Sequence, residues 1–259
     1  MLDQGALKLS WAQASETGMR ETNQDAIGAA RNGELACFVI ADGTGGHHGG
    51  EVASRMVVDT VLGAFCAAPA FGAAALLSYI ADAGAKVANA KRADAQLSDM
   101  STTVAALLVD QHSGRAVWAH LGDTRIYLFR GGRVHAVTRD HSLTQQLIDA
   151  GYVAQDQLRV HPQRNILLAA VGAEGEAAVS ASDDAIALQA GDALLACSDG
   201  LWEWVDEAAM EQTLSATARS EDWLAAMCKA ADAAVLAAGK VRDNYSVYAI
   251  RVHQQESAS

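Results

Sequence analysis

The chain has 259 residues, a formal net charge of −12 at neutral pH and 51% hydrophobic residues. This length can bury one large core, and the sequence has only two prolines and no low-complexity run that would mark a linker, so we predict a single domain over residues 1–259. The acidic excess, without a segregated basic patch, argues against a nucleic-acid partner.

The sequence also argues against a membrane span and a secretory leader. The N-terminus has no basic segment followed by an apolar one. The uncharged stretch 60–81 contains Pro69, which favours two core-facing helices joined there over a single spanning helix. The four cysteines lie in apolar runs without paired ligand spacing, so we expect buried thiols in a cytoplasmic protein.

Apolar and alternating segments predict the strands, and apolar stripes predict the helices. In chain order, we expect strands at residues 36–41, 104–109, 116–121, 126–129, 134–137, 193–197 and 245–252. Helices are expected at residues 51–66, 71–90, 141–150 and 220–238. Because the helices do not alternate with every strand, we predict an α+β fold in which antiparallel sheets are flanked by helix pairs.

The clearest chemical signal lies in residues 38–47. An apolar strand ends at Asp42, and a glycine-rich turn follows that ends in His47. The strand delivers a carboxylate to the rim of a sheet, and Gly43 leaves its own carbonyl accessible to a cation. This construction is typical of a metal site, although Asp and Gly are also common in ordinary surface turns.

Two more aspartates occupy similar positions. Asp199 follows the apolar strand 193–197 and precedes a glycine, and Asp243 comes just before the strand 245–252. Oxygen-only ligands of this kind select hard divalent cations.

Arg20 and Asp25 lie just upstream of the first predicted strand. The guanidinium offers forked donors suited to a phosphate, and Asp25 could orient either that guanidinium or a metal-bound water. Taken alone, such a pair is more often an ordinary surface ion pair.

The order of the motifs resembles the metal-dependent protein serine/threonine phosphatases of the 2C (PPM) type, in particular their compact bacterial members. The matching segments are residues 20–25, 42–47 with 50–54, 100–103, 122–127, 138–143, 161–165, 198–202 and 243–244. Short motifs in series over nearly the whole chain are hard to obtain by chance. The resemblance implies a four-layer α-β-β-α sandwich, a single catalytic domain, and a flap at about residues 145–176.

The resemblance also implies two core ions, Mg²⁺ or Mn²⁺, and a weaker third ion. Asp42 would bridge the two core ions, and the Gly43 carbonyl would bind one of them. Asp199 and Asp243 would bind the other core ion. Asp123, together with Asp199, would bind the third.

The implied activity is hydrolysis of phosphoserine and phosphothreonine in proteins by a metal-activated bridging water, without a covalent nucleophile. Arg20 would hold the substrate phosphate, and His47 would be the general acid, although the neighbouring His48 could take that place. The implied partners are phosphoproteins and a cognate Ser/Thr kinase, whose signalling the protein would reverse. We expect a monomer.

Several positions depart from the family pattern, among them Thr44 and Ser101, where we expect the small changes to be tolerated. Gln24 stands where many members carry a glutamate, and such a change beside a metal can lower affinity about 10- to 100-fold. Glu203 falls where some members place another acid for the third ion. Gln24 favours one alternative, a pseudophosphatase that binds metal or phosphoprotein without turnover. A two-metal nuclease is a further alternative, but it needs cationic tracks that this acidic chain lacks.

Overall fold

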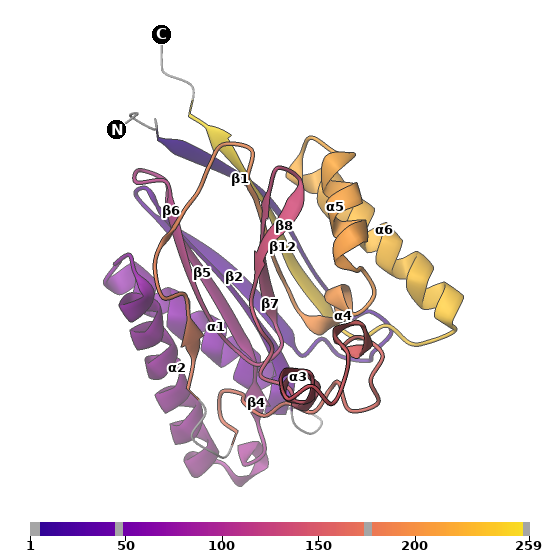
Figure 1. The fold of residues 1–259 in the computed structure, drawn as a ribbon. Coiled ribbons are helices and arrows are strands. Elements are labelled where there is room, and N and C mark those ends of the chain that lie inside the picture. Colours follow the sequence, from indigo (N-terminus) through magenta and orange to yellow (C-terminus); the bar gives the residue numbers. More distant parts are fainter. Residues whose placement is uncertain (1–5, 45–48, 174–177, 256–259) are drawn as a thin grey trace.

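The computed structural model describes residues 6–44, 49–173 and 178–255. Two antiparallel sheets form the centre of the molecule (Figure 1). One has the strand order β1 (Leu7–Glu16), β12 (Tyr245–Gln254), β11 (Ala193–Cys197), β7 (Arg125–Arg130), β8 (Arg133–Val137). The other has the order β10 (Ile186–Ala187), β6 (Arg115–Leu121), β5 (Val104–Asp110), β3 (Leu35–Thr44), β2 (Asp25–Asn32), with β4 (Ser101–Thr102) paired to β3 and β9 (Ser180–Ala181) to β6.

Helices cover the outer face of each sheet. The helices α1 (Gly49–Ala67) and α2 (Ala73–Ala93) pack on the sheet that contains β3, and α5 (Glu207–Ser215) and α6 (Ser220–Ala238) pack on the sheet that contains β12 (Figure 1). Shorter helices are α3 (Leu143–Asp149), α4 (Asp199–Trp202) and the 3₁₀ turns Ala95–Leu97 and Gln155–Gln157. These layers confirm the predicted α-β-β-α sandwich.

Strand β3 is buried on both faces because it lies between two layers. Phe38 and Ile40 pack in the cluster between the sheets, whereas Val39 and Ala41 pack in the cluster under α1 and α2. A strand covered on both sides reads as a continuous apolar run rather than an alternating one. The run therefore brings Asp42 to the end of a rigid strand.

The strands predicted from the apolar runs are confirmed, but β1, β2 and α5 were not assigned ranges from the sequence. Strand β1 is an edge strand with many half-exposed residues, so its alternation is weak. The stretch 60–81 does form two helices, and none of the helices in the described ranges is long and apolar enough to cross a membrane. The expectation of buried cysteines is wrong for Cys66, which is exposed near the end of α1.

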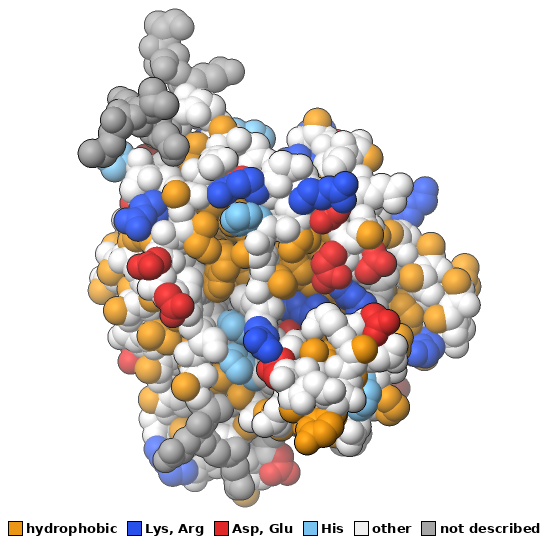
Figure 2. Space-filling view, viewed as in Figure 1, with side chains coloured by type: hydrophobic (Ala, Val, Ile, Leu, Met, Phe, Trp, Pro, Cys, Tyr) orange, Lys and Arg blue, Asp and Glu red, His pale blue; other side chains and the backbone are white. Residues whose placement is uncertain are grey.

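The charged side chains on the face shown in Figure 2 are of both signs. Basic side chains alternate there with acidic and apolar ones and do not merge into a continuous tract. A mixed surface of this kind gives a polyanion no track to follow on that face.

Candidate metal centre

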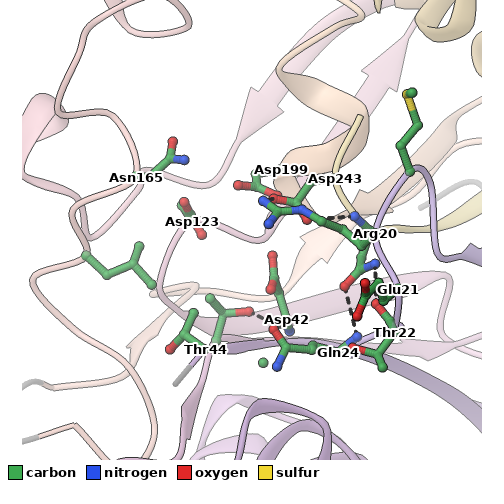
Figure 3. Close-up of a pocket in the computed structure, with 15 residues that line it drawn as sticks. Arg20, Glu21, Thr22, Gln24, Asp42, Thr44, Asp123, Asn165, Asp199 and Asp243 are labelled. Carbon is green, nitrogen blue, oxygen red and sulfur yellow. Dashed lines mark hydrogen bonds and ion pairs between the residues drawn. The ribbon is translucent and has the colours of Figure 1, made fainter. Parts of the chain in front are cut away.

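A cavity of about 660 Å³ lies where the ends of β3, β11 and β12 approach the connection between β1 and β2. Four of its lining residues are the aspartates predicted as metal ligands, which come from well-separated parts of the chain (Figure 3). The cavity is lined by Met19, Arg20, Glu21, Thr22, Gln24, Asp42, Gly43, Thr44, Thr103, Asp123, Asn165, Leu167, Asp199, Asp243 and Asn244.

Asp42 is held by strand pairing and by Thr103. Its register partner on β2 is Asp25, so two carboxylates stand side by side. The Asp42 N–H donates to Thr103 Oγ1 at 2.9 Å, and the Thr103 N–H donates to the Asp42 carbonyl at 2.8 Å. These bonds fix the backbone on both sides of the Asp42 side chain.

Asp199 and Asp243 are brought together by close backbone contact. A Cβ on Gly200 would clash with the Asn244 carbonyl oxygen, so only glycine allows the start of α4 to pack against the start of β12. The Asn244 side chain then fixes the neighbouring connection, because its Oδ1 accepts from the Gln24 N–H at 2.9 Å. Its amide Nδ2 donates to the carbonyls of residues 17 and 22.

A second glycine contact joins the end of β3 to the start of α1. A Cβ on Gly43 would clash with the carbonyl oxygen of Gly50, and a Cβ on Gly50 would lie 2.8 Å from the Gly43 carbonyl oxygen. The sequence interpretation used Gly43 only for access to its carbonyl. In the structure, position 43 also requires glycine because the end of β3 packs closely against the start of α1.

The aspartates lie in an unfavourable environment for their own charge. Burial raises the pKa of Asp42 and of Asp199 well above the usual range, and the neighbouring carboxylates raise both further. Burial also raises the pKa of Asp123 to about 7 and that of Asp25 to about 6. Of the described residues that line the cavity, only Arg20 carries a positive charge.

This donor set fits divalent cations. Within residues 6–44, 49–173 and 178–255, no group of three or more His, Cys, Asp or Glu side chains is placed so that it could hold a metal ion without other ligands. Mg²⁺ sites nevertheless usually keep several waters, and an open, oxygen-lined cavity leaves room for them. In addition, Asp25 Oδ1 is buried and has no hydrogen-bond partner among the described groups. Asp25 is not among the residues that line the cavity, but it is the register partner of Asp42. Cations with their waters would offset the repulsion between the carboxylates.

Arg20 and Asp25 have different interaction partners in the structure. Arg20 Nη2 lies 2.6 Å from Asp243 Oδ2, and its guanidinium extends toward that aspartate at the cavity (Figure 3). Asp25 Oδ2 instead accepts from Ser198 Oγ at 2.8 Å. Both side chains of the Arg20 pair are more than a third exposed, so this ion pair is easily exchanged. His47 and its neighbour His48 lie outside the described residues.

Asp123 sits in the turn between β6 and β7 and is supported by the α4 region. The Trp202 indole N–H donates to the Asp123 carbonyl at 2.9 Å. Glu203 pairs with Arg164 of the predicted flap, with Nε to Oε1 at 2.5 Å. The Glu203 carboxylate therefore already has an ion-pair partner in Arg164.

The sequence interpretation gave no role to several residues of the cavity. Thr103, Asn165 and Leu167 all line it. Thr103 and Asn165 lie in segments that match the family motifs, and this match could have identified them as site residues. Their side chains are uncharged, so they did not stand out as candidate ligands. Asn165 and Leu167 bring the segment 145–176 to the rim of the cavity.

Comparisons with known proteins agree with this geometry. The family model described as protein phosphatase 2C matches residues 13–239. The chain is 35% identical over 202 residues to the serine/threonine phosphatase stp of Listeria innocua, which covers 76% of this chain and 79% of that protein. The structure of the serine/threonine phosphatase Stp1 from Staphylococcus aureus is similar with a TM-score of 0.84 and 26% identity, over 96% of both chains.

A solved structure with bound metal is also similar. It is the catalytic domain of the serine/threonine protein phosphatase PstP in complex with two manganese ions. The TM-score is 0.79 at 27% identity, and the match covers 95% of this chain and 99% of that one.

Proposed function

Because this chain belongs to the protein phosphatase 2C family, we propose that it hydrolyses phosphoserine and phosphothreonine in proteins with Mg²⁺ or Mn²⁺ as its cofactor. The observation that carries the proposal is the cavity in which four aspartates from separate segments converge beside one arginine. The manganese ions of the similar PstP structure support this choice of cofactor.

In this proposal, the carboxylates of Asp42, Asp199 and Asp243 and the carbonyl of Gly43 hold the two core ions. Asp123, with Asp199, holds a third. When bound, the ions supply a nucleophilic water and neutralise charge on the reacting phosphate. In the absence of the ions, the carboxylates repel one another and would also repel a substrate phosphate.

The remaining proposed roles concern phosphate binding and proton transfer. Arg20 exchanges its exposed partner Asp243 for the substrate phosphate, to which its planar guanidinium can donate two hydrogen bonds. Asp25 orients a water beside Asp42, which its unpartnered Oδ1 supports. His47 protonates the departing alkoxide, and His48 remains the alternative.

We also propose a cellular setting. The protein reverses the action of a Ser/Thr kinase in the bacterial cytoplasm as a monomer, and residues 1–259 form one catalytic domain with a flap at about 145–176. The bacterial origin of its relatives supports the first part. All four cysteines of the chain are free, which supports a reducing compartment.

The test is hydrolysis of p-nitrophenyl phosphate with Mn²⁺ or Mg²⁺. We expect activity that is abolished by chelator and reduced at least about 100-fold in Asp42→Asn or Asp199→Asn, because each removes a charged metal ligand. Asp59→Asn, an exposed site on α1, should keep full activity. Phosphoserine and phosphotyrosine peptides then test the substrate class.

The alternative is the pseudophosphatase, which Gln24 suggests from the sequence and which the similarity to named serine/threonine phosphatases does not favour. Gln24 lines the cavity, and its amide carries no charge at the place where the family resemblance implies a glutamate. If the metal-loaded protein bound a phosphopeptide without turning it over, this alternative would replace the enzyme.

A further inference from the structure

A second cavity, of about 430 Å³, adjoins the catalytic cavity. It lies between the connection that follows β1 and the C-terminal end of α6, and its wall includes Val235, Leu236 and Tyr245. Met19 lines both this cavity and the catalytic one. The two cavities therefore share a wall, and the next residue along that wall is Arg20.

The shared wall has a defined backbone. The Met19 N–H donates to the Arg242 carbonyl at 3.0 Å, and the Arg20 N–H donates to the Thr17 carbonyl at 3.1 Å. Gly18 has φ +59°, and a Cβ there would clash with the Asp243 carbonyl oxygen. The turn that carries Arg20 is thus packed directly on the segment that carries Asp243, which fixes where the second cavity lies relative to the phosphate.

The second cavity offers apolar contact. Leu236 is 83% exposed and Met19 is 64% exposed, so two large apolar side chains stand in solvent on its walls. Side chains of this kind on either side of a hollow are typical of a binding site.

The buried guanidinium in this wall is paired through one of its terminal nitrogens, while Arg242 Nη2 is buried and has no hydrogen-bond partner among the described groups. The Arg242 side chain is buried, stacks on the Tyr245 ring with Cζ 3.5 Å from the ring centroid, and pairs with Asp232 at 2.6 Å. Lys240 is the other cation among the described residues of this wall, and it is offset there by the acidic Glu16 and Asp232. A second phosphate would therefore meet two carboxylates and would have to compete with Asp232 for the Arg242 guanidinium. An apolar side chain would not.

We propose that this cavity is a substrate subsite that receives an apolar side chain of the phosphoprotein, close in sequence to the phosphorylated residue. The inference rests on the proposed phosphatase activity and adds a substrate preference to it. The proposal is supported by the continuity of the two cavities, which share Met19. A peptide with its phosphate at Arg20 must pass Met19 to reach Leu236, so the occupant is the substrate chain itself.

The experiment compares phosphothreonine peptides that differ at one flanking position, with leucine or serine placed there and the position moved along the peptide. For the unmodified protein we expect kcat/KM to be about 5- to 10-fold higher with leucine at the positions that reach the cavity, which is the range for a partly buried apolar side chain. Leu236→Ser should reduce this ratio to about 2 or less, mainly through KM.

Two controls separate the subsite from other effects. Hydrolysis of p-nitrophenyl phosphate, which is too small to span both cavities, should be the same in Leu236→Ser and the unmodified protein. Leu77→Ser removes an exposed leucine from α2, a helix that does not line either cavity, and should leave the leucine preference intact.

Equal kcat/KM for all leucine and serine peptides, or a leucine preference that survives Leu236→Ser, would overturn the subsite while leaving the phosphatase activity in place. Absence of turnover of every substrate, p-nitrophenyl phosphate included, would overturn the proposed function and the subsite with it.

Discussion

At the scale of single residues, the aspartates of the cavity oppose the folding of the metal-free chain. Buried carboxylates lose hydration and repel one another, and both effects raise their pKa values. A core built only for stability would not place them together. Their presence is explained by the cations that they would bind.

The first prediction at this scale is that the metal-free protein becomes less stable as pH rises from about 5.5 to about 7. The pKa of Asp25 is raised to about 6 and that of Asp123 to about 7, from an ordinary value of 3.8. Between 3.8 and these values the folded state binds more protons than the unfolded state, so stability falls as pH rises through that window. Thermal unfolding in chelator measures it, with an expected fall in Tm of several degrees.

The control for this prediction is Asp123→Asn, which removes one of the titrating groups and should flatten the profile. Added Mn²⁺ should raise Tm most at the higher pH, because the cation binds the ionised carboxylates. A metal-free protein whose Tm rises steadily from about pH 5.5 to about pH 7 would contradict the raised pKa values.

The residues of the site differ in how well sequence predicts them. Asp42 and Asp199 each follow an apolar strand and precede a glycine, so local pattern alone indicates their position. Asn165 is uncharged and comes from a segment without a regular period, and only the folded chain brings it to the cavity. The ion pair of Arg20 with Asp243 is equally invisible in sequence, because 223 positions separate the two.

At the scale of elements, α1 contacts the end of β3 through Gly50, where the packing requires glycine. Gly50 packs against Gly43 at the end of β3, whereas a Cβ on Gly63, further along the same helix, would meet nothing within 4 Å. The helix therefore contains a glycine that packing requires, Gly50, and another that packing does not require, Gly63.

We predict opposite effects of alanine at these two positions. Gly63→Ala should raise the free energy of unfolding by about 1 kcal/mol, because alanine favours the helix and no atom is displaced. Gly50→Ala should lower it by roughly 1–3 kcal/mol, because its Cβ would lie 2.8 Å from the Gly43 backbone. Urea denaturation of both variants measures the difference.

Activity provides the second readout for this pair. Gly50→Ala should also reduce phosphatase activity, since it displaces the end of β3, and Gly63→Ala should not. Full activity in Gly50→Ala would show that the contact does not position Asp42.

Strand and helix prediction succeeded where a segment is strongly buried or alternates regularly, as β8 does, and failed where neither pattern is present. The central strands β3 and β5 are buried along nearly their whole length, and their apolar runs stand out in the sequence. Strand β2 contains polar and small residues and is half exposed, so it lacks both patterns. Helix α5 has a capping aspartate, Asp206, but only nine residues, which is short for a periodic signal.

At the scale of the whole molecule, the layer between the two sheets decides whether the halves unfold together. Phe38 of β3 contacts Trp11 of β1 and Tyr248 of β12 edge to face, with both pairs of ring centroids 5.3 Å apart. These residues come from both sheets and form one apolar cluster. Neither sheet can lose this layer without exposing the inner face of the other.

We therefore predict that Phe38→Ala lowers the free energy of unfolding by about 3–5 kcal/mol, the usual cost of removing a buried aromatic ring. Unfolding should remain a single transition, coincident by tryptophan fluorescence and far-UV circular dichroism, because the lost ring belongs to both halves. Leu77→Ala, at an exposed position of α2, should change stability little. Separate transitions for the α1–α2 half and the α5–α6 half would instead mean that each sheet and its helices form an independent unit, and the proposal of one catalytic domain over residues 1–259 would fail.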